Sequence, residues 1–175
     1  LDLVPNETIK ADNIIENRLW KYGIKHWNEY FSDRQLLTLT TLVKNSLEIV
    51  QEINDKDYAK VIILYLSFFI CKHAMMNSFG TNWHTRAGKA ESFFAFRRPA
   101  FIFNHAEINP FKKTGGSLEN IISSLKNAIM FAANNKESCQ IALSSVTDLP
   151  SLPEKYDLII TDPPYLDDVQ YGEQS

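Results

Sequence analysis

The stretch Tyr156–Tyr165 constrains the fold more than any other part of this sequence. An apolar run, Leu158 to Ile160, is followed there by Thr-Asp-Pro-Pro-Tyr. A short apolar run of this kind predicts a buried strand. Proline cannot donate to a strand ladder and moves the preceding residue out of the α region, so we expect Asp162 in a rigid extended turn at the carboxyl end of the strand. In open α/β sheets, ligands bind at that end of the strands.

The quartet Asp162, Pro163, Pro164 and Tyr165 suits the activation of an amino group on a nucleobase. Such a group is a poor nucleophile because its lone pair is delocalised into the ring. The carboxylate of Asp162 and the carbonyl oxygen of Pro163 can both accept its N–H hydrogens, which frees the lone pair, and the Tyr165 ring can stack on an extruded base. A proline-rich turn with a locally bonded Asp is the structural alternative. The preceding apolar strand favours the catalytic interpretation.

Composition indicates an ordinary soluble protein. The chain has 175 residues, 45% hydrophobic and 22% charged, with a net charge of −3, so any nucleic-acid contact requires a local patch. Cys71 and Cys139 are far apart and form no C-x-x-C pair, which argues against a zinc site or a disulfide framework and fits a reducing cytoplasm. The longest apolar run, residues 61–70, is too short to span a bilayer, and we expect no signal peptide.

Three helices are expected before residue 83. The first runs from Asp12 to about residue 22 and stops at Gly23. The second begins at the capping box Ser32-Asp33-Arg34-Gln35 and continues to residue 50. The third runs from Asp57 to about residue 79 and is apolar nearly all round, which predicts a central buried helix. His73, near its end, is interpreted as a structural residue.

Residues 83–113 combine basic and aromatic side chains. The segment contains six basic and two acidic residues, with seven aromatic residues interspersed among them. This composition is typical of a nucleic-acid surface, and Arg97 and Arg98 are the candidate phosphate contacts. A solvated face over an aromatic core is the alternative. The alternating phenylalanines at 94/96 and 101/103 are typical of strands.

The C-terminal third reads as a helix followed by two strands. Ser117 is expected to cap a helix that ends near residue 134, after a turn at Gly115-Gly116. A strand is predicted at residues 140–143 and another at 158–160. Helix, strand, loop and strand in this order predict part of a doubly wound sheet.

The chain resembles the large prokaryotic DNA methylases of the adenine-specific type. Three stretches carry the resemblance: residues 27–42 with Phe-Ser-Asp-Arg-Gln, residues 107–111 with Glu-Ile-Asn-Pro-Phe, and residues 143–174 with Asp-Pro-Pro-Tyr. The resemblance implies an α/β fold, a partial Rossmann-like methyltransferase sheet with a mainly helical N-terminal lobe. It implies S-adenosylmethionine as cofactor, adenine N6 in DNA as acceptor, and catalytic roles for residues 162–165.

The resemblance also suggests an organisation in three parts. These are a helical lobe over residues 1–82, a basic aromatic-rich connecting segment over 83–116, and a partial methyltransferase segment over 117–175. Related folds often carry an acidic residue after the preceding strand to meet the cofactor. This chain has Ser145 and Val146 there, our candidate cofactor contacts, with Asp148 slightly later. The chain begins at Leu1 and no G-x-G turn follows a strand, so we expect a fragment whose remaining cofactor site lies outside it.

Two other interpretations remain open. Similar quartets occur in enzymes that methylate guanine N2 in ribosomal RNA, and related Asn-Pro-Pro-Tyr motifs act on glutamine in proteins. The chain can also be a catalytically incomplete nucleic-acid-binding or assembly module. The long helical lobe favours the DNA family, and the intact quartet favours catalysis. The sequence gives no indication of an oligomeric state.

Overall fold

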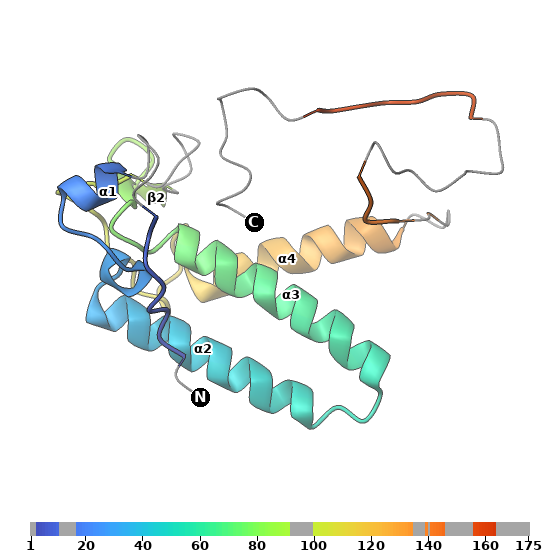
Figure 1. Ribbon diagram of the computed structural model, residues 1–175. Coiled ribbons are helices and arrows are strands. Elements are labelled where there is room, and N and C mark those ends of the chain that lie inside the picture. Colours follow the sequence, from blue (N-terminus) through green and yellow to red (C-terminus); the bar gives the residue numbers. More distant parts are fainter. Residues whose placement is uncertain are drawn as a thin grey trace. The chain divides into compact units, whose positions relative to one another are not determined.

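The computed structural model describes residues 3–10, 17–91, 100–134, 139, 141–145 and 156–163. By its internal contacts the chain forms two compact units, Leu1–Met130 and Phe131–Ser175. The expected boundaries at residues 82 and 116 stay predictions. The elements are α1 (Asn17–Lys21), η1 (Trp27–Tyr30), α2 (Asp33–Gln51), α3 (Lys56–Met75), β1 (Asn82–His84), β2 (Lys89–Glu91) and α4 (Leu118–Ala133) (Figure 1).

A small aromatic core lies at the N-terminal end of the first unit. Ile9, Leu19, Ile24 and Tyr30 are buried together, and partly buried tryptophan and phenylalanine rings pack around them. Helix α1 ends at Lys21, and the turn that stops it contains Gly23, whose φ of +84° suits a residue without a side chain. The predicted stop at Gly23 is therefore confirmed, while the predicted start at Asp12 lies outside the described residues.

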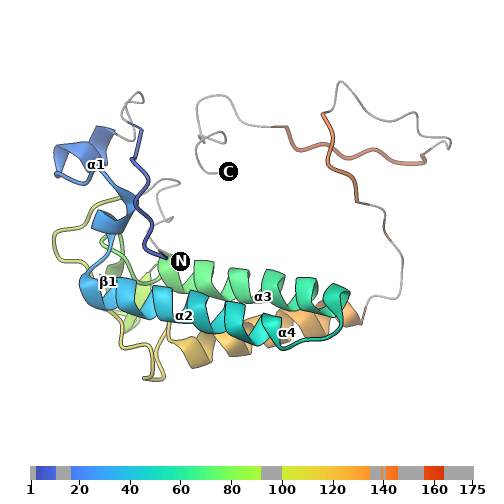
Figure 2. The same cartoon turned by 60° about the horizontal axis from the view of Figure 1, so that its bottom comes forward.

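Helices α2 and α3 form a hairpin and lie side by side (Figures 1 and 2). The Ser32 hydroxyl accepts from the Gln35 N–H at 3.3 Å, and the Gln35 side-chain oxygen accepts from the Ser32 N–H at 2.8 Å. The predicted capping box is thus confirmed. At the start of α3, the Asp55 carboxylate accepts from the N–H groups of Asp57 and Tyr58, each at 3.0 Å. The helix therefore begins at Lys56, one residue before the predicted start.

The prediction that α3 is a central buried helix was wrong. Its buried residues are Ala59, Phe69 and His73, while Leu64 and Phe68 are about half exposed, at 50% and 53%. Helix α2 lies along α3, and Ile121 and Leu125 of α4 line a pocket with Phe69 of α3, but much of the apolar surface of α3 stays exposed in the described part of the chain. By length and composition alone α3 is able to cross a membrane. Core helices of soluble proteins pass the same test, so this carries no conclusion about membranes.

The segment after α3 contains a hairpin that the sequence did not indicate. Strands β1 and β2 pair antiparallel, with Trp83 opposite Ala90. Phe101 and Phe103, predicted as part of a strand, are not in one. Phe101 instead stacks on Tyr22 with ring centroids 4.8 Å apart and packs against the N-terminal core. Residues 94 and 96 lie outside the described residues.

Helix α4 begins as predicted. The Ser117 hydroxyl accepts from the Asn120 N–H at 3.4 Å. Gly116 before it has a φ of +87°, and a Cβ there would lie 2.5 Å from Ile108 Cδ1. Residues 141–145 and 156–163 carry no assigned strand. The Rossmann-like sheet therefore stays a prediction.

Candidate functional site

The structure describes half of the predicted catalytic quartet. Asp162 and Pro163 are exposed at the end of residues 156–163. The apolar residues before them are exposed as well, by 74% at Leu158, 76% at Ile159 and 83% at Ile160. Pro164 and Tyr165 lie outside the described residues. The expectation that this run is a buried strand is thus not met in the described segment.

Of the other predicted site residues, the structure describes Ser145 alone. Ser145 is exposed, at the end of the described segment 141–145. Val146, Arg97 and Arg98 lie outside the described residues. Their roles in cofactor and DNA binding stay predictions.

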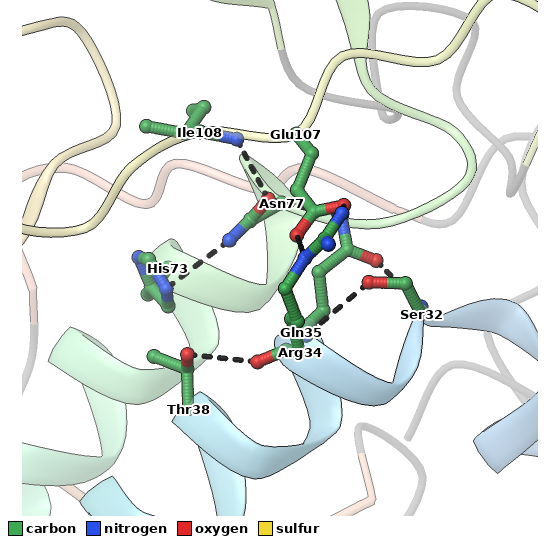
Figure 3. A network of polar contacts seen from close by, with 8 residues as sticks. All are labelled: Ser32, Arg34, Gln35, Thr38, His73, Asn77, Glu107 and Ile108. Carbon is green, nitrogen blue, oxygen red and sulfur yellow. Dashed lines mark hydrogen bonds and ion pairs between the residues drawn. The ribbon is translucent and has the colours of Figure 1, made fainter.

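A network of polar contacts in the first unit joins two of the stretches that carry the family resemblance, residues 27–42 and residues 107–111 (Figure 3). Arg34, in the first turn of α2, contacts Glu107 through two parallel hydrogen bonds, Nε to Oε1 at 2.7 Å and Nη2 to Oε2 at 2.9 Å. The hydrogen bond from the guanidinium lowers the pKa of Glu107 and, in turn, raises the pKa of Arg34. The Arg34 side chain remains 82% exposed. The pair therefore fixes the plane of the guanidinium at the surface.

Asn77, just after α3, is the centre of this network. Its Oδ1 accepts from the Gln35 Nε2 at 2.9 Å and from the Ile108 N–H at 3.1 Å. Its Nδ2 faces His73 Nε2 at 3.5 Å. Gln35, Asn77 and His73 are at most 2% exposed. One buried amide thus links α2, α3 and the segment around residue 108.

His73 extends the network to the start of α4. Its Nδ1 lies 3.2 Å from the Gly116 carbonyl oxygen, which can only accept, so Nδ1 carries the proton. Nε2 is then the acceptor for Asn77, whose orientation is set by its two donors. Burial lowers the pKa of His73. The residue is held as one neutral tautomer, and its interpretation as a structural residue is confirmed.

A groove of about 500 Å³ opens beside the network, between α2 and residues 107–111. Its lining includes the Arg34–Glu107 pair, Leu37, Thr38, Asn109 and Phe111. Leu37 is 67% exposed and Phe111 is 85% exposed. Polar and apolar groups are therefore both accessible along its rim, and we call it the α2 groove.

The resemblance to DNA methylases stays a prediction after comparison with known proteins. Comparison of the chain with protein-family models, curated proteins and solved structures finds no match. Within the described ranges, no group of three His, Cys, Asp or Glu side chains is placed to hold a metal ion.

Sequence reasoning missed the role of Asn77. The available signal was a polar run, Asn77-Ser78, directly after the most apolar helix of the chain. Polar residues at such a place must find buried partners, but the partners lie 31 and 42 residues away along the chain. Gln35 was interpreted only as a capping residue, whereas its side chain serves both the cap and the network.

Proposed function

We propose that this chain is the part of an S-adenosylmethionine-dependent methyltransferase that carries its catalytic motif, and that the enzyme acts on adenine N6 in DNA. The observation that supports the proposal is the quartet Asp162-Pro163-Pro164-Tyr165, which follows the apolar run 158–160 after a single residue, Thr161. The resemblance to adenine-specific DNA methylases supports the same assignment over three separate stretches of the chain.

In this proposal each member of the quartet acts on the target base. The Asp162 carboxylate and the Pro163 carbonyl oxygen accept hydrogen bonds from the amino group, which localises the lone pair on nitrogen. Pro164 restricts the backbone and so holds that carbonyl in direction. The Tyr165 ring stacks on the extruded base. Arg97 and Arg98 neutralise phosphates of the DNA.

The residues present fit the acceptor base better than the cofactor. When bound, S-adenosylmethionine supplies an electrophilic methyl group. Ser145 and Val146 are the candidate contacts, but the sequence contains no G-x-G turn to hold the methionine part of the cofactor. We therefore propose that the complete cofactor site requires further residues, and that the 175-residue chain alone does not bind S-adenosylmethionine at micromolar concentrations. Titration calorimetry tests this, and micromolar affinity would contradict it.

The central test is methyl transfer by the full-length protein that contains this chain. Asp162→Ala should lower the rate by about 10²- to 10³-fold, the usual effect of losing one positioned polar group at a reacting centre. Asp157→Ala, at an exposed Asp in the same segment, is the matched control and should retain activity. Wild-type turnover in purified, folded Asp162→Ala would refute the assignment.

Variants of Tyr165 test the stacking role. Tyr165→Phe keeps the ring and should retain most activity. Tyr165→Ala should weaken productive binding by roughly 5- to 150-fold, which corresponds to the energy of one stacked base. Because a mismatch lowers the cost of extruding the base, a mismatched target adenine should partly rescue the Ala variant. Equal losses in both variants would count against stacking.

The choice of acceptor can be tested in the same assay. Duplex DNA, ribosomal RNA and a glutamine-containing protein fraction should be offered in parallel with labelled cofactor. Label in adenine of DNA supports the proposal, whereas label in guanine of RNA would transfer the assignment to the guanine N2 enzymes. Absence of label from all three substrates would favour the binding-module alternative.

A further inference from the structure

The α2 groove has an exposed aromatic ring at its edge. Phe111 is 85% exposed, and no other ring packs against it within the described ranges. Phe103 is a useful contrast because it is 77% exposed but has the rings of Tyr22 and Phe101 in edge contact at 5.5 and 5.2 Å. Phe103 is thus exposed but already packs against two other rings. The ring of Phe111 has no such contact within the described residues and remains available to a ligand.

The backbone that presents Phe111 is fixed by hydrogen bonds. The side-chain oxygen of Asn109 accepts from the Phe111 N–H at 3.0 Å, which closes an Asx turn. The Pro110 carbonyl oxygen accepts from the Leu118 N–H at 2.9 Å and so ties the turn to α4. Ile108, on the other side, is bonded to the buried network. An ordered backbone lowers the entropy that a ligand must remove on binding.

The charges around the turn leave one cation unmatched. Residues 107–119 contain two carboxylates, and each is already paired. Glu107 contacts Arg34, and Glu119 contacts Lys113 at 3.0 Å. Lys112 lies directly beside Phe111 in the sequence and has no ion pair within the described residues. The turn therefore joins an exposed ring to a neighbouring lysine that no carboxylate of the described residues pairs with.

The groove itself suits a planar polar group. Its volume of about 500 Å³ lies within the usual range of ligand pockets, roughly 300–1,000 Å³. The Arg34 guanidinium, held flat by Glu107, offers a second planar surface on which a base can stack. Thr38 and Asn109 add polar groups to the lining. A purely apolar partner would leave these polar groups without water or hydrogen bonds, which disfavours a hydrophobic protein segment.

We propose that the α2 groove binds an unpaired nucleic-acid strand, with a base stacked on Phe111 and a phosphate near Lys112. Single-strand binders combine stacking rings with cations in this way. The proposal concerns binding alone and goes beyond the proposed function, because it requires neither the cofactor nor Asp162.

Fluorescence anisotropy with a labelled twelve-nucleotide thymidine strand and the full 175-residue chain tests the proposal. Phe111→Ala should raise the Kd by roughly 5- to 150-fold. Phe111→Trp should retain binding, while Phe111→Leu should lose it, since Leu keeps the apolar character but not the ring. Equal binding by wild type and Phe111→Ala, or wild-type binding by Phe111→Leu, would overturn the stacking role. The Leu outcome would point to a hydrophobic protein partner.

Salt dependence tests the phosphate contact. Lys112→Ala should reduce the slope of log K against log[salt] by about 0.7, the value for one contact with a single strand. Lys44→Ala is the matched control, because Lys44 is an exposed lysine of α2 that pairs with Glu48 away from the groove lining. An equal change in both variants, or tighter binding of a blunt duplex than of the single strand, would overturn the proposal. Thermal melting establishes that each variant is folded.

These outcomes are separate from those of the proposed function. Methyl transfer depends on Asp162 and is measured with cofactor, whereas the anisotropy assay contains none. Loss of stacking at Phe111 without any change in methyl transfer would still support the groove as a binding site. Failure of the Asp162 test would leave the groove proposal unaffected.

Discussion

Acidification from pH 7 to pH 5 should destabilise the first unit because His73 is held in its neutral form. The ordinary pKa of this residue is 6.5, and burial lowers it in the folded protein. In that state Nδ1 donates to the Gly116 carbonyl oxygen, and Nε2 faces the Asn77 amide. A proton on Nε2 would face another donor, the Nδ2 group of Asn77.

The direction of the pH effect follows from proton binding. Below pH 6.5 the unfolded chain binds a proton at His73 that the folded chain does not yet hold, so the free energy of unfolding decreases as the pH falls. For one proton the slope approaches about 1.4 kcal/mol per pH unit. Glu29 and Glu107, whose pKa values are lowered from 4.5, also cost stability on acidification, but only near and below that value. The window from pH 5 to 6.5 lies above the range of both carboxyl groups, so among these three groups the histidine dominates the slope there.

Urea unfolding followed by far-ultraviolet circular dichroism measures this slope. His73→Gln should remove it, because glutamine can donate to Gly116 without titrating. Asn77→Asp should reverse its sign: the carboxylate keeps an oxygen for Gln35 and Ile108, and its other oxygen accepts from a protonated His73. The raised pKa of His73 would then make stability greatest at low pH and decrease as the pH rises through it. A flat wild-type profile between pH 5 and 6.5, or the same slope in Asn77→Asp, would refute this reasoning.

Three smaller predictions concern the backbone and helix caps of the first unit. Gly116→Ala should destabilise by roughly 2–5 kcal/mol, because a positive φ and a Cβ placed 2.5 Å from Ile108 Cδ1 both oppose it. Gly23→Ala should cost only about 1–2 kcal/mol, since its φ of +84° is similar but no atom lies within 4 Å, and equal melting temperatures for the two variants would show that the close contact is relieved. Ser32→Ala should cost about 1 kcal/mol through loss of its bond to Gln35, and an unchanged urea midpoint would contradict the role of the cap.

Local features of the fold could be predicted from the sequence because a few adjacent residues determine them. The capping box at Ser32 and Gln35 and the glycine stop at Gly23 involve residues at most three positions apart. The exposure of α3 could not be predicted in this way. An all-round apolar helix is buried only where other segments of the fold cover it, and in the described residues Leu64 and Phe68 stay about half exposed.

The two candidate sites also differ in whether neighbouring residues in the sequence determine them. The quartet at Asp162 is a continuous motif that is visible in the sequence alone. The structure describes Asp162 and Pro163, which are exposed, and the catalytic role of the quartet stays a prediction. The α2 groove depends on pairing between Arg34 and Glu107, which are 73 residues apart. Neither Arg34 nor Glu107 has sequence neighbours that indicate its partner. The ion pair forms only because the fold brings the two segments together.

The sequence separation of the Asn77 network has a kinetic consequence. Helices α2 and α3 are joined by residues 52–55, so their pairing closes a short loop and can form early. The contacts of His73 with Gly116 and of Asn77 with Ile108 close loops of 43 and 31 residues, and they can form only when the later segment docks. Contacts completed after the folding barrier alter the unfolding rate more than the folding rate. Asn77 should therefore control chiefly how long the folded unit persists, and the helical hairpin how quickly it forms.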